Sequence, residues 1–100
     1  MADEIRASYD ELEQVASKFA NQAQVIQQMT QKVRGSYDKL EDGGWIGRGS
    51  EAFFAEMRDK IFPACQRLQG ALEDACAATK DIARTFKQAE QEASAPFRSA

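Results

Sequence analysis

The stretch Asp42-Gly43-Gly44-Trp45-Ile46-Gly47-Arg48-Gly49-Ser50 interrupts an otherwise helical sequence. Four of the six glycines fall in these nine residues, together with the only tryptophan. Glycine reaches backbone angles that other residues avoid, so the cluster predicts a sharp reversal over residues 42–49 between two long segments. A tryptophan in such a turn either caps a core or is recognised by a partner, because its large apolar ring is costly to leave in water.

The segment before the turn, residues 4–41, carries a series of side chains in alternating steps of three and four, and all of them except Thr30 are apolar. This heptad spacing predicts one amphipathic helix that packs lengthwise against another helix. The series is Ile5, Tyr9, Leu12, Ala16, Phe19, Ala23, Ile26, Thr30, Val33, Tyr37 and Leu40. A helix of this length and composition is not stable alone, so it needs a partner surface.

The segment after the turn, residues 50–94, repeats the same spacing and predicts a second long helix with Ser50 as its N-cap. Its series is Phe54, Met57, Ile61, Cys65, Leu68, Leu72, Ala75, Thr79, Ile82, Phe86, Ala89 and Ala93. Pro63 removes one backbone donor within this pattern, which predicts a kink near Pro63, with a complete break as the alternative. Pro96 predicts the end of the helix and a frayed tail over residues 95–100.

Two helices joined by a short turn form an antiparallel hairpin, so we expect an all-α fold with one domain over residues 1–100. The expected register places Leu40 near Phe54, Val33 near residues 57–61, and Ile5 near residues 86–88. Beyond about Glu90 the second helix is expected to have no intramolecular partner.

The apolar faces are wider than one neighbouring helix can cover, and we expect Phe53 and Phe62 to remain partly exposed. Burying a phenylalanine contributes roughly 2–3 kcal/mol, so exposed ones favour association. We therefore expect the hairpin to dimerise into a four-helix bundle, as a homodimer, because no charge in the seam would repel a second copy. Candidates for the dimer core are Leu12, Phe19, Ile26, Phe54, Ile61, Leu68 and Leu72.

Composition argues against several classes of function. The formal charge of −3 argues against a nucleic-acid-binding protein. The sequence has no run of about 18 apolar residues, so it predicts no transmembrane segment. The acidic start of the chain has neither the basic region nor the apolar region of a classical signal peptide.

Catalytic and metal-binding residues are scarce. The chain has no histidine, which removes the commonest general base and metal ligand, and no residues have metal-ligand spacing. We therefore expect no enzyme activity, no metal and no cofactor. Cys65 and Cys76 are too far apart on one helix for a disulfide and are expected to be reduced and buried; an intermolecular disulfide or redox switch is the alternative.

Trp45-Ile46-Gly47 at the turn of a helical hairpin of about one hundred residues resembles the WXG (Trp-x-Gly) family of early-secreted-antigen-like substrates of type VII (ESX) secretion. The resemblance covers essentially the whole chain. It implies antiparallel hairpins that dimerise, with themselves or with a paralogous WXG protein. It also implies an export signal read by an FtsK-like ATPase.

That export signal combines Trp-x-Gly from one chain with Tyr-x-x-x-Asp/Glu from the partner's second helix. Trp45 and Gly47 match its first part. Phe86-Lys87-Gln88-Ala89-Glu90 is the best match to its second part, with phenylalanine in place of tyrosine. The string from Tyr9 to Glu13 also matches but lies in the first helix. The heptad series favours a core position for Phe86 and a surface position for Glu90.

The resemblance implies a small, dimeric, non-catalytic protein that is cytoplasmic before export and is secreted without a classical signal peptide. It would act through protein–protein contacts, as an effector or as an adaptor for other exported proteins. The alternative is an intracellular helical adaptor or chaperone that is never exported. A small enzyme is the third interpretation.

Overall fold

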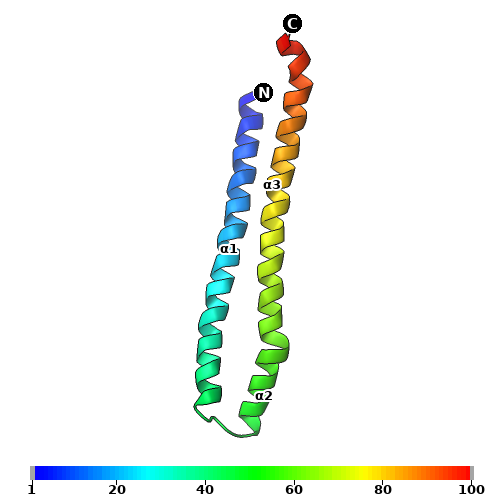
Figure 1. Ribbon diagram of the computed structural model, residues 1–100. Helices are drawn as coiled ribbons and strands as arrows, with labels where there is room; N and C mark the ends of the chain where they lie inside the picture. The colour runs from blue at the N-terminus through cyan, green and yellow to red at the C-terminus, as the bar shows by residue number, and fades with distance from the viewer. Residues whose placement is uncertain (1, 100) are drawn as a thin grey trace. The chain divides into compact units, whose positions relative to one another are not determined.

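The chain folds into helices joined by one turn, and the computed structural model describes the backbone of residues 2–99 and the side chains of residues 8–93. Helix α1 spans Ala2–Asp42. After residues 43–47 the second helical stretch runs as α2 (Arg48–Glu56), a π-helical turn η1 (Met57–Ile61) and α3 (Phe62–Ser99). Residues 2–99 contain no strand. The predicted all-α class and helical hairpin are confirmed (Figure 1).

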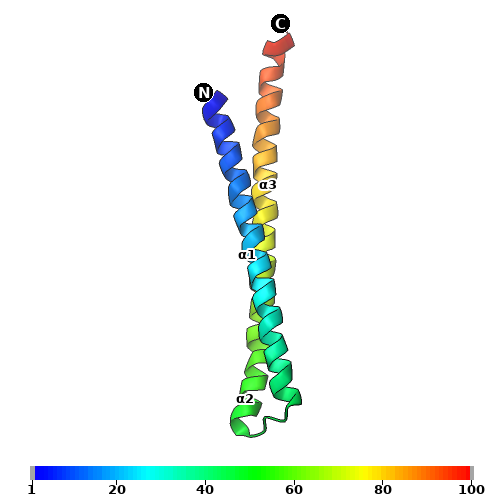
Figure 2. The same cartoon turned by 90° about the vertical axis from the view of Figure 1, so that its left-hand side faces the viewer.

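Two compact units make up the chain, and each pairs antiparallel helical segments. Unit 1 joins the α1 residues up to Ala20 with the α3 residues from Glu73 onward, and unit 2 is the continuous segment Asn21–Leu72, which includes the turn. In unit 1, both views show the C-terminal end of α3 reaching beyond the N-terminal end of α1 (Figure 1, Figure 2).

Small and aromatic side chains fill the seam between the helices of each unit. The buried apolar residues in the described part are Ala16, Ala23, Tyr37, Phe62, Cys76 and Ala83. Alanine at these positions lets two helices approach closely. The hydroxyls of Thr30 and Thr79 donate to the carbonyls four residues earlier, at 2.8 and 2.7 Å, so neither polar residue brings an unpaired group into the seam.

The π-helical turn η1 takes the place of the predicted kink near Pro63. The N–H of Phe62 donates to the carbonyl of Met57, five residues earlier. Proline has no N–H for the carbonyl of Asp59, and the wider turn shifts the hydrogen-bond pattern by one residue just before it. The predicted alternative, a complete break, does not occur.

Because η1 contains one extra residue, some of the residues after it that face α1 lie one position later in the sequence than predicted. Phe54 and Phe62 both contact Tyr37, although eight residues separate them, because the π turn adds one residue to two turns of helix. Downstream, Phe62, Cys76 and Ala83 are buried where the heptad series had placed Ile61, Ala75 and Ile82.

The ends of the second helical stretch differ from the prediction. α3 continues to Ser99, so residues 95–99 are helical and the predicted end at residue 94 is not observed. A proline costs a helix one donor and one local clash, which bends a helix without necessarily ending it. Residue 100 lies outside the described residues.

The register is shifted by about one helical turn from the predicted one. Tyr9 contacts Glu90 and lies beside Lys87, whereas the prediction had given this position to Ile5, whose side chain lies outside the described residues. α1 continues for a further seven residues before Tyr9, from Ala2 to Ser8. The level of Glu90 is therefore not the point at which α3 passes the N-terminal end of α1, as had been predicted.

Candidate functional site

Gly47, the glycine of Trp-x-Gly, is required by the backbone of the turn. It is the N-cap of α2 with φ 144° and ψ 173°, a combination that glycine alone adopts readily. A Cβ built on Gly47 would meet nothing within 4 Å, so this requirement is conformational rather than steric. Gly44, with φ 77°, is the other glycine of the turn in the left-handed region.

Ser50 was expected to be the N-cap, and this prediction is wrong. α2 begins at Arg48, which places Ser50 inside its first turn. The Ser50 hydroxyl is buried and donates to the carbonyl of Gly47 at 2.8 Å, and the N–H of Glu51 donates to the same carbonyl at 3.1 Å. Ser50 therefore fixes the start of α2 through the glycine rather than by capping.

Trp45 packs on the start of α2 but remains half exposed. Its ring centroid lies 5.5 Å from that of Phe53 and 5.6 Å from that of Phe54, both in edge-to-face contact. The side chain keeps 46% of its surface accessible, and the neighbouring Ile46 keeps 87%. Trp45 thus caps the aromatic cluster while about half of the residue remains accessible to solvent.

The aromatic cluster behind Trp45 anchors the turn to the two helical segments of unit 2. Tyr37 lies at its centre, with ring centroids 5.1 Å from Phe54 and 5.4 Å from Phe62. Phe62 is buried, contrary to the prediction, because the Tyr37 ring packs against it edge-to-face and the guanidinium of Arg34 lies 4.3 Å from its centroid. Burial, followed by the Glu41 hydrogen bond and charge, raises the pKa of Tyr37 above 10.0.

The C-terminal candidates Phe86 and Glu90 are arranged opposite to the expectation. Phe86 is 61% exposed rather than in the seam. Glu90 is half-buried, and its Oε2 accepts a hydrogen bond from the Tyr9 hydroxyl at 2.7 Å. Burial, then this hydrogen bond and the Glu90 charge, raises the pKa of Tyr9 above 10.0. Tyr9 and Glu90 belong to two different candidate motifs in the sequence, Tyr9–Glu13 and Phe86–Glu90, and the fold brings them together.

Exposed apolar side chains lie on one side of the seam in each unit, which we call the apolar side. At helical spacing they fall on the same flank of the buried rows. In unit 1 they are Val15, Ile82 and Phe86, and in unit 2 they are Val25, Met29, Val33, Leu40, Ile61 and Leu68. Of the predicted dimer-core residues, Ile61 and Leu68 lie on this side, whereas Leu12, Phe19, Ile26, Phe54 and Leu72 are half-buried within their own unit.

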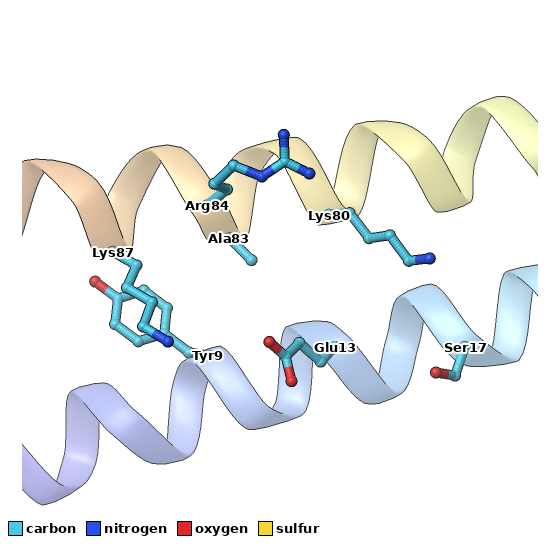
Figure 3. A pocket seen from close by; sticks show the side chains of 7 residues that line it. All are labelled: Tyr9, Glu13, Ser17, Lys80, Ala83, Arg84 and Lys87. Atoms are coloured by element: carbon cyan, nitrogen blue, oxygen red, sulfur yellow. The ribbon is translucent and has the colours of Figure 1, made fainter.

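The opposite flank of the seam, the polar side, carries a groove in each unit. The groove of unit 1 lies between α1 and α3 and has a volume of about 440 Å³ (Figure 3). It is lined by Tyr9, Glu13, Ser17, Lys80, Ala83, Arg84 and Lys87. The groove of unit 2 is lined by Arg34, Tyr37, Glu41, Arg58, Phe62, Pro63 and Gln66.

The described residues contain no cluster of three or more potential metal ligands. Within the same part of the chain, no helix is both long and apolar enough to cross a membrane. Cys65 is half-buried and Cys76 is buried, and both are free thiols.

A comparison with protein-family models matches residues 4–91 to WXG100, described as proteins of 100 residues with WXG. No curated protein and no solved structure matches the chain significantly. The family match spans both helical stretches and the turn that holds Trp45-Ile46-Gly47. Proteins of this family are small secreted type VII substrates that typically form dimers with a partner WXG protein. The chain therefore belongs to the WXG100 family.

Proposed function

We propose that this protein is a dimeric, non-catalytic substrate of a type VII secretion system that acts through protein–protein contacts, as an effector or as an adaptor for other exported proteins. The observation that carries the proposal is the family match over residues 4–91, with Trp45 half exposed at the hairpin turn. Before export the protein is cytoplasmic, and an FtsK-like ATPase reads its signal. The runner-up function is an intracellular helical adaptor or chaperone that is never exported.

The export signal combines Trp45 and Gly47 of one chain with Phe86 and Glu90 of its partner. The half-exposed ring of Trp45 supports this proposal, because an ATPase can contact only an accessible ring. Gly47 contributes by holding the backbone of the turn, and Glu90 by its carboxylate beside Tyr9.

Export of the Trp45→Ala variant tests the signal, with Ile46→Ala as the matched control. Both changes remove an exposed apolar side chain from the same turn. In cells with an intact type VII system we expect the wild type and Ile46→Ala in the medium, and Trp45→Ala retained in the cells. Retention of the wild type in such cells would instead favour the intracellular adaptor.

The apolar side of each unit supports a homodimer. Side chains such as Leu68 and Ile82 keep 48% and 49% of their surface accessible. Completing the burial of one such side chain contributes about 1 kcal/mol, so nine of them together provide a substantial drive toward association. Of the dimer core predicted from sequence, only Ile61 and Leu68 belong to this side, and the other seven exposed residues of this side complete the proposed interface.

Sedimentation equilibrium at micromolar concentration tests the dimer. Leu68→Lys/Ile82→Lys places two charges on the apolar side, and we expect this variant to be monomeric. The matched control, Ser17→Lys/Gln66→Lys, places the same charges on the polar side, and we expect it to sediment as a dimer. A monomeric wild type would contradict the homodimer and would direct the search to a second WXG protein.

A further inference from the structure

The groove of unit 1 carries charges in alternating order along its length. Figure 3 shows Lys80 and Lys87 reaching from α3 toward α1, with the Glu13 carboxylate on α1 between them. Arg84 turns away from α1 and pairs with Asp81 at 3.6 Å. The sequence along the groove is therefore cation, anion, cation.

These three charges are available to a ligand. Lys80, Glu13 and Lys87 take part in no ion pair within the described residues, although all three line one groove. The floor between them is the buried Ala83 and the ring of Tyr9, whose hydroxyl is already engaged by Glu90. The groove thus combines an apolar floor with unpaired charges on its walls.

The spacing of the charges matches a helix. Lys80 and Lys87 are two turns apart on α3, which is about 10.5 Å along the helix axis. One face of a partner helix presents residues i, i+3 and i+7 over the same length. A helix with acidic, basic and acidic side chains at these positions would pair with Lys80, Glu13 and Lys87 in turn.

We propose that this groove docks a helix of a partner protein that carries an acid–base–acid stripe at i, i+3 and i+7. The inference deepens the adaptor role and rests on it, because it identifies the chemistry of the cargo helix. The groove lies on the polar side, so it stays accessible when a second copy covers the apolar side. A polyanion such as a phosphate chain fits less well, because Glu13 would repel it at the centre of the groove.

Peptide binding tests the order of the charges directly. The probe is a fluorescent helical peptide of about 20 residues with Glu, Lys and Glu at i, i+3 and i+7, since shorter helices are marginal in water. Its control has the same composition in the order Glu, Glu, Lys. By fluorescence anisotropy at low salt, we expect the first peptide to bind the dimeric protein at least roughly tenfold more tightly than the control.

Charge reversals in the protein test whether the peptide binds in the groove of unit 1. We expect Lys80→Glu/Lys87→Glu to abolish the preference, and Lys32→Glu/Arg67→Glu, with the same change of net charge outside the groove, to retain it. The triple reversal Glu13→Lys/Lys80→Glu/Lys87→Glu should prefer a Lys, Glu, Lys peptide. Circular dichroism checks that each variant remains helical.

Three outcomes would overturn the proposal. The two peptides of equal composition could bind equally, which would indicate non-specific attraction. The Lys32/Arg67 control could lose the preference as completely as the groove variant. Alternatively, Lys80→Glu/Lys87→Glu could change the mass in sedimentation, which would make the groove a contact between copies. Because binding is measured without secretion, a negative result leaves the export proposal standing.

Discussion

Gly47→Ala isolates the backbone contribution of the glycine in Trp-x-Gly. At φ 144° and ψ 173° an alanine is strained by roughly 1–3 kcal/mol. Alanine also reduces the freedom of the unfolded chain, which returns about 0.4–1 kcal/mol at compatible sites. Beyond the glycine itself and its two neighbours in the chain, no atom lies within 4 Å of the added Cβ, so no clash with the rest of the fold contributes. We therefore expect a net loss of roughly 1–2 kcal/mol in the free energy of unfolding.

Gly49→Ala is the matched control, because it makes the same chemical change two residues later. Gly49 lies within α2 and does not have a positive φ, and a Cβ there also meets nothing within 4 Å. Alanine is the better helix former by about 1 kcal/mol, so this variant should be more stable than the wild type. The two substitutions are expected to change stability in opposite directions.

Urea denaturation followed by circular dichroism measures both variants. Protein concentration is held constant, because association of the folded chain raises its apparent stability. If Gly47→Ala proves as stable as Gly49→Ala, the positive φ costs nothing. In that case the glycine must be needed for recognition by a partner rather than for the turn.

Two further predictions concern packing and pH. Phe62→Ala removes a ring that is 4% exposed and should cost about 3–5 kcal/mol in urea denaturation. Ile46→Ala, at a residue that is 87% exposed, should cost less than about 1 kcal/mol, and equal losses would contradict the burial of Phe62. The pKa values of Tyr9 and Tyr37 are raised in the folded protein, so stability is complete below the ordinary tyrosine pKa of 10.0 and falls as pH rises through the raised values. Tyr9→Phe should flatten this alkaline decline, measured as the free energy of unfolding between about pH 8 and 12; an unchanged slope would show that Tyr9 does not titrate with folding.

The turn and the two helical stretches were predictable because their signals are local. A heptad series specifies an amphipathic helix wherever it occurs, and the glycines around Trp45 specify a reversal. The need for glycine at residue 47 follows from the backbone angle that the turn adopts, which a residue pattern indicates only as a preference.

Some of the α3 residues that face α1 were predicted incorrectly. Extrapolating a regular spacing from Phe54 brings Ile61 and Ile82 into the seam, but the extra residue in η1 brings in Phe62 and Ala83. Pro63 was the available signal. It indicated the place of the irregularity but not that a π turn would absorb one residue.

The pairing of Tyr9 with Glu90 could not be predicted from either helix alone. The two residues are 81 positions apart in the sequence. An error of one helical turn in the predicted register is enough to keep them from being paired. The register between the helices depends on the conformations of the five-residue turn and of the π turn. An error in predicting either one shifts every predicted pairing farther along the helices.

The π turn at Met57–Ile61 also marks where the length of the chain can change most easily. Removing one residue there would restore regular helix while keeping Phe54 and Phe62 on the same side. Removing one residue near Cys76 would rotate everything beyond it by about 100° relative to the part before it. We therefore expect natural deletions among homologous chains to fall within η1 and to be absent from α3. The π turn would then be the place where this helical stretch can lose a residue during evolution without rotating the residues that follow it.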